Sequence, residues 1–196
     1  MNSSIRPRHL IAGLVALLLV GLAAPAWALD AYRDRRGLYY GLGIGGGNVT
    51  SKTDGSEGDG TLGFNIRGRL GGGVSQQLTL DGELGMNLHS EEFAGGAEVS
   101  RQLYTMYVGA NFYPLKDTGL YLRGMGGMAV ASVTVDIPGL GSDSKSETGL
   151  GLGAGAGFEF FVNADLAIGV GADYQWISIE DTDINMLSVG VNANWY

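Results

Sequence analysis

The 196-residue chain contains no cysteine, so it can form neither a disulfide framework nor the lipid-modified cysteine of a lipoprotein. Beyond residue 28 it holds one histidine, His89, which leaves little material for histidine-based catalysis. The same part of the chain has no apolar run of about 18 residues, so no membrane-spanning helix is predicted. These absences exclude disulfide-rich scaffolds and helical membrane proteins.

Basic residues are scarce as well. After residue 28, ten Lys and Arg residues stand against twenty Asp and Glu residues, a net charge of −10. Proteins that bind nucleic acid carry basic surfaces, so no nucleic-acid partner is predicted. The segment Gly41–Gly46 matches the glycine pattern of dinucleotide sites, but no helix follows it and no βαβ unit surrounds it. We therefore predict no cofactor.

The N-terminus has the pattern of an export signal. Arg6 and Arg8 precede an apolar run from Leu10 to Ala24, and small residues follow at Ala26 and Ala28. A basic start, an apolar stretch and small residues at the cleavage site are typical of a secretory signal peptide. The sequence predicts a signal peptide over residues 1–28, an N-terminal linker over 29–36 and one domain over 37–196.

Glycine is abundant, with 35 residues, and it is placed regularly. In Thr148–Phe161 it occupies every second position from Gly149 to Gly157, between apolar residues. Alternation with a period of two is typical of a strand with two different faces. It recurs eight times, over residues 37–47, 61–71, 78–89, 101–113, 119–133, 148–161, 166–177 and 186–196. Short turns alternate with longer polar connections, predicted over residues 48–60, 90–100, 134–147 and 178–185.

A soluble, lipocalin-like barrel and a membrane barrel would both alternate in this way. The predicted strands contain no lysine, whereas the surface of a soluble barrel should be rich in Lys and Glu. Aromatic residues gather near the strand ends, as bilayer interfaces favour. One girdle comprises Tyr40, Phe112, Phe158, Phe160 and Trp195, with Tyr39, Tyr113, Tyr121, Phe161 and Tyr196 at the same end; the other comprises Phe64, Tyr104, Tyr174 and Trp176. The sequence predicts an all-β fold, an eight-stranded antiparallel up-and-down transmembrane β-barrel.

The polar faces of these strands carry both signs of charge. Charges that are removed from water must be paired and hydrogen-bonded, so we expect ion pairs across a narrow lumen. The residues predicted to form them are Arg67, Arg69, Arg123, Asp81, Glu83, Glu159 and Asp173. Inward-facing glycines in such a barrel either make room for Tyr107 and Tyr121 or leave a true cavity, and the sequence does not separate these two interpretations.

Phrases such as "GLYYGLGIG", "YVGANFYP" and "GLGAGAGFEF" resemble the eight-stranded outer-membrane β-barrels of Gram-negative bacteria, the OmpA/OmpX type, over Gly37–Tyr196. The ending "GVNANWY" is similar to the C-terminal signal by which the barrel-assembly machinery recognises such proteins, here Gly190, Ala193, Trp195 and Tyr196. The resemblance implies a monomer in the bacterial outer membrane, in contact with its lipid and lipopolysaccharide.

Three functions remain open. The first is a non-enzymatic structural or loop-displaying role with a polar, side-chain-filled lumen, in which acidic loops meet an unidentified partner or bridging divalent cations. The second is a narrow pore for small solutes. The third is a lipid A-modifying enzyme, but adjacent strand residues point to opposite faces, so His89 is badly placed to activate Ser90. The loop acids are Asp54, Glu57, Asp59, Glu91, Glu92, Glu98, Asp136, Asp143, Glu147, Glu180, Asp181 and Asp183.

Overall fold

The computed structural model describes residues 34–53, 56–58, 60–92, 98–116, 118–137 and 141–196. The predicted signal peptide and most of the predicted linker lie outside these residues. Among the described residues, no helix is long and apolar enough to cross a membrane. The strands are β1 (Gly37–Thr53), β2 (Ser56–Glu57), β3 (Thr61–Ser75), β4 (Leu78–Glu92), β5 (Glu98–Phe112), β6 (Leu120–Ile137), β7 (Gly141–Phe161), β8 (Leu166–Ile179) and β9 (Thr182–Trp195).

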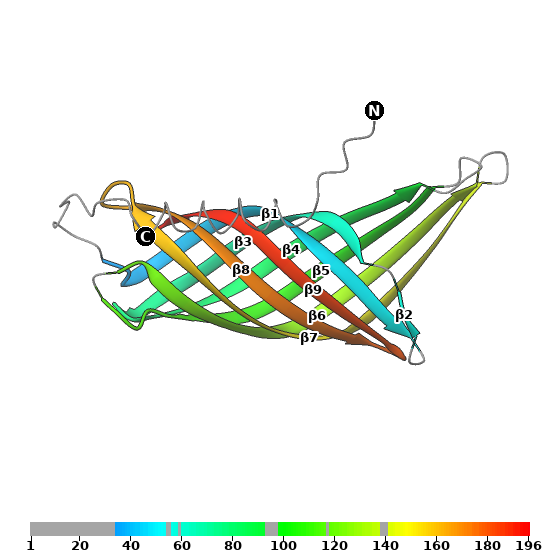
Figure 1. Ribbon diagram of the computed structural model, residues 1–196. Helices are drawn as coiled ribbons and strands as arrows, with labels where there is room; N and C mark the ends of the chain where they lie inside the picture. The colour runs from blue at the N-terminus through cyan, green and yellow to red at the C-terminus, as the bar shows by residue number, and fades with distance from the viewer. Residues whose placement is uncertain (1–33, 54–55, 59, 93–97, 117, 138–140) are drawn as a thin grey trace, which may run out of the picture. The chain divides into compact units, whose positions relative to one another are not determined.

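All strands belong to one antiparallel sheet that closes on itself (Figure 1). Each strand from β3 to β9 pairs with the next, and β1 pairs with both β3 and β9. The two-residue β2 only extends the hairpin that follows β1, so the wall of the barrel has eight strands. The predicted eight-stranded up-and-down barrel is confirmed.

The barrel is apolar outside and polar inside. Leu42, Leu84 and Val108 are 60%, 64% and 72% exposed, whereas Glu83 and Asn111 are buried at 2% and 4%. A soluble barrel has the opposite arrangement, with its apolar face inside. An outward apolar band around a polar interior is characteristic of barrels that cross a bilayer.

The strands run farther than the hydrophobic pattern predicts. The predicted connection over residues 178–185 is wrong, because β8 and β9 continue through it and leave a two-residue turn of Glu180 and Asp181. Glu180 has a φ of 50°, in the left-handed region. Lys52 and Lys145 consequently lie inside strands β1 and β7. Backbone pairing continues in β8 and β9 although outward positions such as Ser178 and Asp183 have become polar.

Strands β4–β7 reach beyond their neighbours at the end of the barrel opposite the start of β1 and the end of β9 (Figure 1). Glu92 pairs with Glu98, and Ile137 pairs with Gly141, so the predicted connections over 90–100 and 134–147 are largely strand. β7 pairs with β8 only from Leu150 onward. We call this end the far end, and the end where β1 begins and β9 ends the terminal end.

The inward glycines accommodate large side chains that lean over them from nearby strands. A Cβ atom on Gly151 would collide with the Tyr107 hydroxyl, and one on Gly171 would lie 2.6 Å from the Tyr121 hydroxyl. Gly157 also faces the Tyr121 ring, 2.5 Å from its Cζ atom. Of the two interpretations that the sequence leaves open, these contacts favour the one in which the glycines make room for the two tyrosines.

Candidate functional site: the barrel lumen

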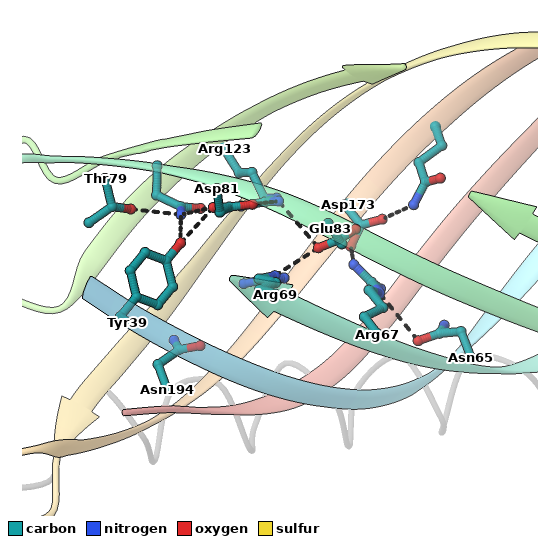
Figure 2. Close-up of polar contacts among 12 residues, drawn as sticks. Tyr39, Asn65, Arg67, Arg69, Thr79, Asp81, Glu83, Arg123, Asp173 and Asn194 are labelled. Carbon is teal, nitrogen blue, oxygen red and sulfur yellow. Dashed lines mark hydrogen bonds and ion pairs between the residues drawn. The ribbon is translucent and has the colours of Figure 1, made fainter. Parts of the chain in front are cut away.

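Arg123 on β6 is the centre of a buried polar network (Figure 2). Its Nη1 atom donates to Asp81 and Asn111, both at 2.9 Å, and its Nη2 atom donates to Asp81 at 2.6 Å and to Glu83 at 3.2 Å. Asp81 and Glu83 lie on β4 and Asn111 on β5, two neighbouring strands. The bidentate pair with Asp81 is the strong, orientation-specific kind of hydrogen bond.

Two further arginines extend this network along the lumen. Arg69 donates from Nε to Glu83 at 2.7 Å, and Arg67 forms an ion pair with Asp173 on β8 (Figure 2). Gln175 donates to the other oxygen of Asp173 at 2.9 Å. We call Arg67, Arg69, Arg123, Asp81, Glu83 and Asp173 the central network. Three positive and three negative charges balance within it.

Glu159 takes a partner that the sequence did not predict. It lies away from the central network and accepts a 2.7 Å hydrogen bond from Nε of Arg35, which precedes β1. Both side chains are almost completely buried, although Arg35 falls within the predicted linker. The Arg35 guanidinium lies 4.0 Å from the centre of the Tyr113 ring, within range of a cation–π interaction. No alternation marks this segment, so the pattern of the strands gave no signal for it.

Several tyrosines that were predicted at the aromatic girdle lie in the lumen instead. Tyr39 and Tyr113 are each 2% exposed, and the Tyr39 hydroxyl donates to Asp81 at 2.6 Å. Tyr39 and Tyr40 are adjacent in a strand, so only one of them can face outward. The Tyr196 ring stacks on Tyr39 with ring centres 5.2 Å apart. The sequence places these tyrosines correctly near the strand ends, but the prediction that they face the lipid is wrong.

Near the far end the lumen is filled by apolar side chains. Leu103, Ala129, Ile177 and Ile179 form a buried cluster from three strands, with Ala131 and Ile184 packed against it. This cluster was not predicted from the sequence, although the alternating phase of β8 already turns Ile177 and Ile179 inward. The lumen therefore changes from ionic to apolar along its length.

The sequence model of a protein family, the outer membrane protein beta-barrel domain, matches residues 14–194 of this chain. The chain belongs to this family. It is similar in structure to Ail of Yersinia pestis, solved with the heparin analogue sucrose octasulfate, at a TM-score of 0.62 and 20% identity over 81% of this chain and 99% of that one. Neisserial surface protein A gives a TM-score of 0.51 and 15% identity, over 80% of this chain and 98% of that chain. These identities show the fold alone. No curated protein matches the chain.

Family membership makes this chain a bacterial outer-membrane protein, so its outward face meets lipid. The residues predicted to form the two girdles occupy the strand positions that point out of the barrel. Tyr40 is 54% exposed and stacks on Trp195 across the β1–β9 pair, with ring centres 5.2 Å apart. Phe158 and Trp195 are half-buried, and the others are exposed: Phe112, Phe160, Phe64, Tyr104, Tyr174 and Trp176.

The C-terminal residues that resemble the family's assembly signal serve different faces of β9. Ala193 pairs with Leu42 in the outward phase, and Gly190 allows close approach of β1, since a Cβ atom there would lie 2.6 Å from the Ile44 carbonyl oxygen. Tyr196 turns inward, and its hydroxyl lies 3.1 Å from Glu159 Oε1. The terminal aromatic residues are thus split between lipid and lumen.

A small cavity of about 30 Å³ lies beside the central network, lined by residues including Arg69, Arg123 and Asn192. Among the described residues, no cluster of acidic, histidine or cysteine side chains could hold a metal ion. Outside the membrane-spanning strands, Asp34 accepts hydrogen bonds from the side chain and backbone of Arg36, which lower the pKa of its carboxyl group to about 2. This exposed pair lies next to buried Arg35.

Proposed function

We propose that this protein is a non-enzymatic structural barrel of the outer membrane, with a sealed lumen and outward display of its far-end hairpins. The observation that carries this proposal is that three groups of side chains follow one another along the lumen and fill it. Arg35 and Glu159 lie at the terminal end, the central network lies in the middle and the apolar cluster follows toward the far end. Small barrels are commonly filled by side chains in this way.

A solute pore is the weaker candidate. The cavity beside the central network, about 30 Å³, has room for water but for no larger solute. Its walls include Gly43, Gly155 and Gly171, and three arginines, Arg67, Arg69 and Arg123, line it as well. Opening a path would require breaking buried ion pairs, which is costly because each charge left behind loses its partner.

A lipid-modifying enzyme has little support either. His89 is 7% exposed, and a Cβ atom on Gly63 would collide with its ring. It points into the lumen from β4. A histidine in this position is badly placed to reach a lipid at the barrel surface.

The hairpins at the far end supply the surface for display. Acidic residues are concentrated there, with Glu180 and Asp181 in the β8–β9 turn and Glu92, Glu98 and Asp136 at paired positions of β4, β5 and β6. Such a surface favours a cationic partner, or divalent cations that link it to the phosphates of lipopolysaccharide. We further propose that the barrel is a monomer and that the barrel-assembly machinery binds β9.

Single-channel recording from the protein in a planar lipid bilayer tests the seal. We expect no conductance steps from protein whose folding is verified by far-UV circular dichroism and whose insertion is verified by protection from protease in the same lipid. The Arg36→Ala variant is a matched control, because it removes an exposed arginine next to the lumen and should also be silent. Discrete and reproducible conductance steps of the wild-type protein would refute the sealed lumen and support the pore.

A further inference from the structure

Among the strands that the structure describes, β1 and β9 are the only paired neighbours of the barrel wall that do not follow one another along the chain. Every other neighbouring pair is connected directly in sequence, whereas β1 and β9 are the first and last strands of the wall. Their pairing runs from Tyr40 with Trp195 to Thr53 with Thr182. Chain ends fray unless something ties them down. This seam is thus the place where the barrel would open most easily.

One carboxylate lies where both chain ends can reach it. Glu159 belongs to β7, which is separated from the seam by β8. From the N-terminal side, Arg35 donates to its Oε1 atom at 2.7 Å, two residues before β1 begins. From the C-terminal side, the Asn194 amide donates to Oε2 at 3.1 Å, and the Tyr196 hydroxyl lies within 3.2 Å of both oxygens.

The surroundings hold this arrangement in place. Arg35 is 1% exposed and packs against the rings of Tyr113 and Phe161, 4.0 and 5.3 Å from the ring centres. Its backbone crosses the sheet so closely that a Cβ atom on Gly73 would collide with the Arg35 carbonyl group. Gln76 accepts from the Arg35 backbone amide at 3.4 Å and donates to Asp34 at 2.8 Å. The segment before β1 is therefore a packed part of the barrel.

From these contacts we infer that Arg35, Glu159, Asn194 and Tyr196 form a terminal clasp that locks the β1–β9 seam. Glu159 takes the place of the missing turn, because it binds the start of β1 and the end of β9 to a strand outside the seam. The clasp holds the seam shut whether or not the lumen conducts, so it stands independently of the proposed seal. It also gives the inward-turned C-terminal Tyr196 a role that its outward neighbour Trp195 does not share.

Hydrogen exchange of the protein in lipid vesicles tests the clasp, because exchange measures local opening strand by strand. In the Arg35→Ala variant we expect amides of β1 and β9 near the terminal end to exchange at least about tenfold faster, since a buried carboxylate loses its charged partner. Amides of the β4–β5 ladder should keep their wild-type rates. Glu159→Gln should give the same pattern, and combining the two changes should add little.

Two controls separate the clasp from general destabilisation. Arg36→Ala removes the neighbouring exposed arginine and should leave every rate unchanged. Arg123→Ala removes a buried arginine away from the seam, and its effect should centre on β4, β5 and β6. Should Arg35→Ala prevent folding, Tyr196→Phe removes only a hydroxyl and should still speed exchange at the seam. Faster exchange that is uniform over all strands, or none at the seam, would overturn the clasp.

Discussion

Replacing Arg123 by alanine tests how much the central network contributes to stability. The side chain is 2% exposed and donates four hydrogen bonds, two of them to Asp81. Removing one partner of a buried ion pair costs about 3–5 kcal/mol, because the remaining charge stays buried. We expect the lower end, about 3 kcal/mol, because the acids keep other donors. Asp81 retains the Tyr39 hydroxyl at 2.6 Å, and Glu83 retains Arg69 at 2.7 Å.

Urea titration of the protein in lipid vesicles, followed by far-UV circular dichroism, measures this loss. With a denaturant slope of about 1–3 kcal/mol per molar urea, the midpoint should fall by about 1–3 M. Arg36→Ala, which removes an exposed arginine, should leave the midpoint where it is. Pairing Arg123→Met with Asp81→Asn should recover part of the loss, because both charges are then removed.

The reasoning fails if Arg123→Ala costs less than about 0.5 kcal/mol, the range of ordinary surface substitutions. Such a result would mean that Asp81 and Glu83 are not held as buried charges in the lumen. An Arg123→Met, Asp81→Asn pair that is no more stable than Arg123→Met alone would also contradict the assignment, because it would show that Asp81 is not left unpaired.

The same titration checks two predictions about backbone and packing. Gly171→Ala should cost about 1–3 kcal/mol by overpacking, and much less in a Tyr121→Phe background, which removes the hydroxyl 2.6 Å from the new Cβ atom. Gly68→Ala is its control, because nothing lies within 4 Å of that position, and an equal cost of Gly171→Ala in both backgrounds would refute the contact. Glu180→Gly should stabilise by about 1 kcal/mol, because Glu180 has a φ of 50°. Asp181→Gly should not stabilise the protein. An equal gain in stability at the two positions would show that backbone strain at Glu180 is not the cause.

The wall of the barrel follows from the sequence because lipid and lumen impose opposite demands on alternate residues. Leu84 must face lipid and Glu83 must not, so a period of two reveals both the strand and its faces. The signal ends where the strands leave the bilayer. Ser178 and Asp183 still pair, but the apolar residues of this stretch, Ile179 and Ile184, lie inside the barrel. The outward apolar pattern stops here, so the stretch was predicted as a loop.

Partners inside the lumen are harder to predict than the residues that point into it. Alternation places Glu159 on the inner face, but it cannot tell which of several arginines meets it across the barrel. Arg35 comes from a segment without alternation and reaches Glu159 over 124 positions of sequence. Tyr39 was misplaced because aromatic residues suit both a bilayer interface and a packed lumen, and only the strand phase separates the two.

The glycine faces are best understood together with the large side chains on the strands near them. Large inward side chains come mainly from β3 to β6, as with Arg67, Tyr107 and Arg123, while β1 and β7 present glycines to the lumen. In a narrow closed barrel, a large inward side chain leans over a nearby strand and needs a position there with no Cβ atom. A run of inward glycines therefore does not by itself indicate a channel. At Gly151 and Gly171 it marks the space that Tyr107 and Tyr121 already fill.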